Sequence, residues 1–236
     1  MKTIGLIGGV TWQSTSDYYR TINTAISRRL GGAHSARLVL VSLDFAEVLA
    51  CMQAGDEEAV FARYLDAATA LRRCEADFMV LCSNTAHRRA DRLAEAAGLP
   101  LLHIGDATGT AVRRAGLATI GLLGTRSTME GDFIAGRLRT RHGLSVLVPE
   151  EPDRREIDRL IYTEMSAGVF SDHARSVIAD AARALAERGA QGLILGCTEL
   201  PILMRGQDIG VPAFDTAALH ASAAADHALE ENRDTP

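Results

Sequence analysis

The chain has 236 residues, of which 47% are hydrophobic and 23% charged, and its formal net charge at pH 7 is −5. This composition is typical of a globular protein with one large core or two lobes of roughly 100 residues each. The acidic balance, without a long basic block, argues against nucleic acid and anionic membranes as partners. No run of about 18 apolar residues occurs and no leader-like segment precedes the first strand, so we expect a cytoplasmic protein.

The four cysteines are Cys51, Cys74, Cys82 and Cys197, and they form no C-x-x-C pair. Their spacing argues against a structural zinc site and against a disulfide framework, so no metal is expected. Cys51 and Cys74 are interpreted as buried or half-buried thiols without a role.

The first half of the chain alternates between apolar runs and amphipathic segments. Thr3 to Gly9 predicts a strand that ends in a glycine turn, and a helix follows, capped by Ser14 to Ser16 and ended at Gly31 and Gly32. The pattern then predicts strands over 38–43, 78–82 and 101–104 and helices over 56–74 and 87–97.

The cycle restarts at Ala118 to Thr125, which predicts another strand. After it the pattern predicts helices over 129–142, 154–167, 172–188 and 216–229, strands over 144–148, 192–195 and 212–215, and a frayed tail over 230–236.

Two stretches of the first half recur in the second. Ile4 to Gly8 is repeated at Ile120 to Gly124, an offset of 120 − 4 = 116 residues. Residues 75–85 align without a gap on 189–199, which places Ser83 opposite Cys197 at an offset of 197 − 83 = 114. The two offsets indicate one duplicated α/β unit.

The predicted fold class is therefore α/β, with two doubly wound, Rossmann-like lobes built on parallel sheets and related by a pseudo-twofold axis. We expect residues 1–105 with 214–236 to form the first lobe and residues 106–213 the second. The final helix is expected to pack back on the first lobe. Ser83 and Cys197 would then face each other across a cleft.

Cys197 directly follows the buried, uninterrupted apolar run Gly192 to Leu195, which is typical of an interior parallel strand. Ligands of open parallel sheets bind outside the carboxyl ends of the strands, so a half-exposed, reactive thiol is expected there. A helix beginning near Thr198 would favour a thiolate and a bound carboxylate.

The segments Ser83-Asn84-Thr85-Ala86-His87 and Gly196-Cys197-Thr198-Glu199 together resemble the paired motifs of the cofactor-independent aspartate/glutamate racemase family. The opening Ile4 to Gly9 with Trp12 and Ser14, and Phe214 to Thr216, fit the aspartate racemase branch, so the resemblance spans nearly the whole chain.

This resemblance implies an amino-acid racemase that needs neither pyridoxal phosphate nor a metal, acts on a small amino-acid substrate and forms a homodimer. Two cysteines of the family remove and return the α-proton; here the first position is Ser83 and the second Cys197. Cys82 is adjacent to Ser83, yet strand alternation points its side chain to the other face. The residues that the resemblance assigns to the substrate's α-carboxylate are Asn84, Thr85 and Thr198, with Ala86 in the same motif.

The serine changes the expected chemistry. A thiol has a reference pKa of about 8.5 and can serve as a base near neutrality, whereas a serine hydroxyl is a far weaker acid and needs a partner base. We therefore expect Cys197 to act as the base and Ser83 to return a proton or position a water. The predicted enzyme favours the enantiomer whose α-proton faces Cys197.

Further residues are candidates for the pocket or for neighbouring structure. Val10, Thr11 and Gln53 follow a strand or lie in an early loop and are candidates to line the pocket. Glu164 reads as a solvated helix position that can also approach the substrate, and His87 as a cap, surface residue or proton relay. A distal carboxylate would need a cation, for which Arg63, Arg88 and Arg126 are available.

Two other functions stay open from the sequence. Relatives of the same superfamily that keep a single cysteine, such as arylmalonate decarboxylases and maleate isomerases, use their thiol as proton donor or nucleophile. The third possibility is an amino-acid-binding protein weakened in catalysis by the loss of its first cysteine. The segment Ser83 to His87 favours the amino-acid branch.

Overall fold

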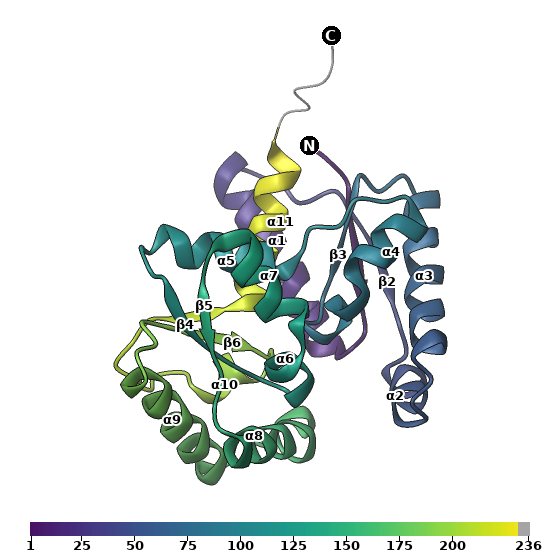
Figure 1. The fold of residues 1–236 in the computed structure, drawn as a ribbon. Coiled ribbons are helices and arrows are strands. Elements are labelled where there is room, and N and C mark those ends of the chain that lie inside the picture. Colours follow the sequence, from purple (N-terminus) through teal and green to yellow (C-terminus); the bar gives the residue numbers. More distant parts are fainter. Residues whose placement is uncertain (231–236) are drawn as a thin grey trace. The chain divides into compact units, whose positions relative to one another are not determined.

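The computed structural model describes residues 1–230. The chain divides into two compact units: unit 1 is Met1–His103 with the chain from His220 onward, and unit 2 is Ile104–Leu219. Each unit contains one parallel sheet covered by helices (Figure 1), which confirms the predicted α/β class. Apart from Glu230, the predicted tail lies outside the described residues.

The sheet of unit 1 has the strand order β2-β1-β3. Its strands are β1 (Ile4–Gly8), β2 (Leu38–Ser42) and β3 (Phe78–Leu81). Every residue of β1 and β3 is buried, as their uninterrupted apolar sequences predict for strands covered on both faces.

The helices of unit 1 are α1 (Trp12–Leu30), α2 (Phe45–Gln53), α3 (Glu57–Arg73), α4 (Ala90–Ala97) and the greater part of α11 (Thr216–Leu229). One face of the sheet shares a core with α2, α3 and α4. Beside it, α11 lies next to α1 (Figure 1), where the Tyr18 hydroxyl contacts His220 Nδ1 at 2.9 Å. The final helix therefore packs back on the first unit, as the sequence predicts.

The sheet of unit 2 has the order β5-β4-β6-β7. Its strands are β4 (Thr119–Gly124), β5 (Ser145–Leu147), β6 (Leu193–Gly196) and β7 (Ala213–Asp215). Alternate residues of β4 serve two cores: Ile120 and Leu122 belong to one cluster and Leu123 to the other.

The helices of unit 2 are α5 (Ile104–Arg114), α6 (Arg126–Glu130), α7 (Asp132–His142), α8 (Glu151–Thr163), α9 (Asp172–Glu187) and α10 (Leu200–Leu203). Residues of α5 and α7 pack with Ile120, and residues of α8 and α9 pack with Leu123. Both faces of β4 are thereby covered.

The strand register repeats between the units. Gly5 pairs with Met79 in unit 1, and their counterparts Gly121 and Leu193 pair in unit 2. The fourth strand is repeated in part, because Met79 N–H donates to Pro100 O at 2.7 Å and Leu193 N–H to Pro212 O at 2.8 Å. These matching pairs support the duplication inferred from the sequence.

The prediction of a strand over 101–104 is wrong. Only a single bridge forms, between Met79 and Leu101, and Ile104 begins α5, which the sequence did not predict. Glycine lowers helix propensity, and α5 contains two of them. The structure explains Gly109, since a Cβ there would lie 2.4 Å from the His142 ring, so close packing of α5 on α7 requires glycine.

A second helix, α2, was also missed, and Gln53 is its last residue rather than part of a loop. The cap expected at Ser14 to Ser16 is wrong as well. Thr11 holds the N-cap position of α1, and the buried Ser14 hydroxyl instead donates to Cys82 O at 3.2 Å.

Three predicted helices are interrupted. The helix predicted over 129–142 is divided at Gly131, whose backbone is extended. The one predicted over 87–97 begins as a 3₁₀ turn, η1 (Thr85–Arg89), before α4. The one predicted over 154–167 is α8 followed by η2 (Met165–Ala167). Within residues 1–230, no helix combines the length and apolar character needed to cross a membrane.

Candidate functional site

Cys197 lies directly after β6, where the strand leaves the sheet of unit 2. The side chain is half-buried and packs against the core cluster that contains Leu123 and Met129. The chain turns at once, because the Leu200 N–H donates to Cys197 O at 3.2 Å. The thiol is thus placed at the carboxyl end of an interior strand, where open parallel sheets carry their ligand sites.

A carboxylate accepts the proton of this thiol. Cys197 Sγ donates to Glu199 Oε2 at 2.8 Å, and the Thr198 hydroxyl donates to the same oxygen at 2.9 Å. Burial, and next the Glu199 charge, raise the pKa of the Cys197 thiol well above its usual value. No role is predicted for Glu199 from the sequence; its position two residues after the cysteine was the available signal.

This environment corrects the expectation of a helix that lowers the thiol pKa. The helix α10 has only four residues and begins at Leu200, so its end offers little positive potential. The neighbouring charge is instead the negative carboxylate of Glu199. The thiol is therefore protonated at rest, with its proton directed at Glu199.

The end of α8 approaches the same thiol. At this end of α8, burial first, then Asp158 and then Cys197, raise the pKa of the Tyr162 phenol. Glu164 caps α8 and accepts a hydrogen bond from the Ser171 hydroxyl at 2.6 Å. Glu164 is thus half-buried and engaged rather than a solvated helix position. Tyr162 was not predicted, because nothing in the sequence links α8 to β6.

The equivalent strand end of unit 1 carries Ser83, Asn84, Thr85 and Ala86 in one turn after β3. Asn84 is buried and the other three are half-buried; Ala86 packs against the core of this unit. The beginning of α1 meets this turn through the bond from Ser14 to Cys82 O.

The buried side chain of His87 contacts the backbone of this turn. The ring is 2% exposed, and its Nδ1 lies 2.8 Å from Ser83 O, while its backbone N–H donates to Asn84 O at 3.0 Å. Of the three roles considered from the sequence, the geometry corresponds to a cap.

Of the remaining cysteines, Cys82 is buried, and burial raises the pKa of its thiol. This thiol therefore stays protonated. Cys51 is half-buried, as expected, whereas Cys74 is exposed.

Two predicted pocket residues take different positions in unit 1. Val10 follows β1 and packs against the core cluster of this unit. Gln53 lies at the exposed end of α2. Among the described residues, no three His, Cys, Asp or Glu side chains are grouped so that they could hold a metal ion.

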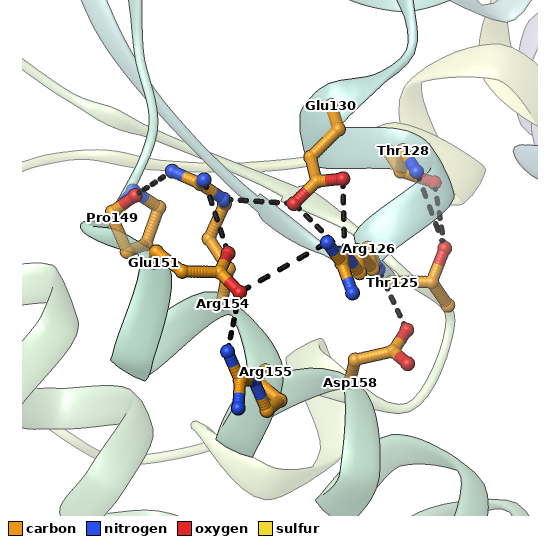
Figure 2. Close-up of polar contacts among 9 residues, drawn as sticks. All are labelled: Thr125, Arg126, Thr128, Glu130, Pro149, Glu151, Arg154, Arg155 and Asp158. Carbon is orange, nitrogen blue, oxygen red and sulfur yellow. Dashed lines mark hydrogen bonds and ion pairs between the residues drawn. The ribbon is translucent and has the colours of Figure 1, made fainter.

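The three arginines considered for a distal carboxylate all pair with carboxylates of the protein. Figure 2 shows Arg126 between Glu130 and Glu151, with its backbone N–H donating to Asp158. Arg63 pairs with Glu47, and Arg88 pairs with Glu57 at 3.2 Å. Each guanidinium is thus neutralised within its own unit.

Comparisons with known proteins identify relatives of this chain. The family model described as Asp/Glu/hydantoin racemase matches residues 7–224. A Yersinia pestis protein assigned as an Asp/Glu racemase is 46% identical in sequence. Its crystal structure matches with a TM-score of 0.92 over 98% of this chain and 100% of that one. An aspartate racemase homologue from Pyrococcus horikoshii OT3 is 31% identical, with a TM-score of 0.81 over 98% of this chain and 100% of that one.

A glutamate racemase from Deinococcus radiodurans is 31% identical over 160 residues, which are 66% of this chain and 52% of the relative. The match thus spans about half the length of that protein. The family match extends over most of the chain, from β1 into α11, and includes the turns after β3 and β6. The resemblance seen in the paired motifs is confirmed, and the chain belongs to the Asp/Glu/hydantoin racemase family.

Proposed function

We propose that this protein is a racemase of aspartate, glutamate or both, which removes and returns the α-proton without pyridoxal phosphate. The observation that carries the proposal is the hydrogen bond from the Cys197 thiol to Glu199 at the carboxyl end of β6. The names of the relatives from Pyrococcus horikoshii and Deinococcus radiodurans support the substrate class.

The lysine content supports a reaction without pyridoxal phosphate. Enzymes that use this cofactor hold it through a lysine Schiff base. Lys2 is the single lysine of the 236 residues, and it precedes β1, at the opposite end of the sheet from the turn after β3. We therefore assign the proton transfers to side chains of the chain itself.

The first proton transfer is assigned to the Cys197 and Glu199 pair. Burial and the Glu199 charge disfavour a free thiolate, so the thiol proton has to move to the group that already accepts its hydrogen bond. Transfer from Sγ to Glu199 leaves a thiolate beside a neutral carboxylic acid. That thiolate takes the α-proton as a new S–H bond and leaves the electron pair on the α-carbon.

The return of a proton to the other face of the α-carbon is assigned to Ser83, directly or through a water that it holds. Asn84, Thr85 and Thr198 are proposed to bind the α-carboxylate. Because a serine hydroxyl is a poor base, the enzyme should be faster from the enantiomer whose α-proton faces Cys197. The homodimer and the cytoplasmic location stay predictions.

The decisive experiment follows the α-proton of L- and D-aspartate and of L- and D-glutamate by proton NMR in deuterium oxide. Wild-type protein should replace the α-proton with deuterium, and Cys197→Ala should slow this by about 10²–10⁴-fold, because the base is lost. Cys74→Ala, at an exposed thiol, is the matched control and should exchange at the wild-type rate.

Three results would contradict parts of this proposal. Exchange that survives in Cys197→Ala would remove Cys197 from the mechanism. Equal rates from both enantiomers would remove the directional bias. No exchange with any of the four amino acids would exclude the racemase, and arylmalonate and maleate would then test the decarboxylase and isomerase alternatives.

A further inference from the structure

Behind the turn after β3, unit 1 buries four polar aromatic side chains, here called the histidine cluster: Tyr18, His87, His103 and His220. They come from α1, η1, the segment before α5, and α11, and each is 3% exposed or less. The ring of His87 lies 4.6 Å from that of His103 and 5.4 Å from that of His220, between centroids. The cluster thus joins segments that are far apart in the sequence at the base of one turn.

The hydrogen bonds of His220 fix where its proton lies. Its Nε2 is 2.8 Å from Leu102 O, and a carbonyl can only accept, so Nε2 carries the hydrogen. In the neutral ring Nδ1 is then an acceptor, and the Tyr18 hydroxyl donates to it at 2.9 Å. His220 is therefore locked in one tautomer and one orientation against the ring of His87.

The same reasoning fixes His87 in the opposite tautomer. Its Nδ1 is 2.8 Å from Ser83 O, so Nδ1 carries the hydrogen and donates to that carbonyl. The bond replaces a missing backbone bond, because the chain starts as a 3₁₀ turn in which the His87 N–H donates to Asn84 O instead. The Ser83 carbonyl, which a regular helix would have satisfied with this N–H, is satisfied by the side chain.

The surroundings keep His87 neutral, as this hydrogen bond pattern requires. Burial, and next the neighbouring His103 and His220, lower the pKa of His87 well below its usual value. A neutral ring between two other rings cannot rotate without losing its bond to Ser83 O. The orientation of the Ser83 backbone is thereby tied to the packing of the histidine cluster.

We propose that His87 is a positioning residue for Ser83: its Nδ1–H, oriented by the histidine cluster, holds the Ser83 carbonyl and so aims the hydroxyl that returns the proton. The proposal rests on the proposed racemase function. It assigns His87 to the proton transfer at Ser83, whose carbonyl the His87 ring contacts.

Three substitutions separate this role from general packing. An asparagine amide nitrogen lies close to the position of Nδ1, and a glutamine amide nitrogen close to that of Nε2, so only His87→Asn keeps the donor for Ser83 O. His87→Gln and His87→Ala lose it. His34→Ala, at an exposed histidine, is the matched control.

The kinetic readout is the ratio of inversion to α-proton exchange, measured together by chiral analysis and NMR in deuterium oxide. Exchange with retention needs only Cys197, whereas inversion also needs Ser83. Because both rates are measured on the same sample, their ratio does not depend on the amount of folded enzyme. His87→Ala and His87→Gln should lower the ratio roughly tenfold or more through misplacement of Ser83. His87→Asn and His34→Ala should keep the wild-type ratio. A ratio that is unchanged in all three His87 variants would overturn the proposal.

A second readout does not depend on activity. Amide hydrogen exchange of residues 83–87 should lose protection in His87→Ala and His87→Gln and regain it in His87→Asn, while the amides of β3 stay protected. Long-range proton–nitrogen spectra should show His87 with its hydrogen on Nδ1. A hydrogen on Nε2, or a turn equally protected in all variants, would overturn the positioning role. If wild-type protein exchanges no substrate, the proposed function fails and this readout still decides the role of His87.

Discussion

The two units share one strand register, yet the ends of their equivalent strands have opposite chemical surroundings. The turn after β3 in unit 1 carries Ser83, whose carbonyl is held by a neutral histidine inside a buried aromatic cluster. The turn after β6 in unit 2 carries Cys197, whose thiol is bonded to the carboxylate of Glu199. One strand end thus holds the backbone carbonyl of a serine, and the other directs the proton of a thiol at a carboxylate.

This contrast indicates that register and site chemistry are set by different residues. The pairing of Gly5 with Met79, repeated at Gly121 and Leu193, depends on small and apolar side chains that are buried within the sheets. The residues that differ follow the strands, where a turn can change its side chains without changing the sheet. Duplication therefore preserved the scaffold while the side chains of the two turns diverged.

The largest effect is expected where the backbones themselves differ. Gly9 of unit 1 is the counterpart of Thr125, but its φ is +93° and a Cβ there would lie 2.0 Å from Leu43 O. Gly9→Thr should lower the free energy of unfolding by about 4 kcal/mol, because both the left-handed backbone and the overlap are unfavourable. Fluorescence of Trp12, the single tryptophan, reports chemical unfolding of unit 1.

The reciprocal substitution is the control. Thr125 has an ordinary φ of −63° and caps α6 by accepting from the Thr128 N–H at 3.3 Å. Thr125→Gly should cost only about 0.5 kcal/mol, because glycine is itself tolerated at a helix N-cap. Its unfolding is followed by circular dichroism, since Thr125 belongs to unit 2. Similar losses for the two substitutions would show that the strand ends are structurally equivalent after all.

The sequence repeats predicted the sheets well because the repeat lies in buried strands, where apolar runs dictate the structure. Gly9 and Thr125 show the limit, since the residues at this one position of the turn have different backbone conformations, which no periodicity reports. The missed helix α5 has a similar cause: Gly109 weakens the helical pattern, and the reason for it is the ring of His142 from another helix.

Only those parts of the candidate site that lie in a short stretch of sequence could be predicted. The paired motifs made Ser83 and Cys197 candidates from the sequence, since each motif is local. The histidine cluster was not predictable, because His103 and His220 meet His87 through contacts between distant segments. The hydrogen bond from the Cys197 thiol to Glu199 was not predicted, because it depends on a distance rather than on residue type.

The second largest effect is expected from acid, which should lower the folding stability of unit 1. Within residues 1–230 the three buried histidines all lie in unit 1, and burial lowers the pKa of His220 to about 4 from an ordinary 6.5. The unfolded chain binds a proton at His220 below about pH 6.5 while the folded chain does not, so stability is retained above that pH and lost as the pH falls toward 4. This group alone should cost about 3 kcal/mol over that range.

Urea unfolding followed by Trp12 fluorescence between about pH 7 and pH 4 measures this loss. His220→Gln is the control, because its amide keeps a donor near Nε2 for Leu102 O and does not titrate. Its stability should fall less steeply with acid. A wild-type midpoint independent of pH over this range would disprove the linkage.

Removing the carboxylate tests the other strand end. Glu199→Gln should lower the pKa of the Cys197 thiol, since a negative neighbour is lost, and so speed its alkylation by iodoacetamide near neutral pH. At the same time α-proton exchange should slow by about 10²-fold, because no group accepts the thiol proton. Glu187→Gln, at an exposed site on α9, should change neither rate. Exchange that rises together with alkylation would show that Glu199 only suppresses the thiolate.

The smallest effect is expected from making the two strand ends alike. Ser83→Cys replaces a weak proton donor with a thiol and leaves the bond from His87 to the Ser83 carbonyl intact, because that bond involves only the backbone. The exchange rates from the two enantiomers, measured separately in deuterium oxide, should then approach each other by roughly tenfold, since a thiolate is the better base. If the bias between the enantiomers is unchanged by the new thiol, the preferred direction is set by Cys197 and Glu199 and not by the serine.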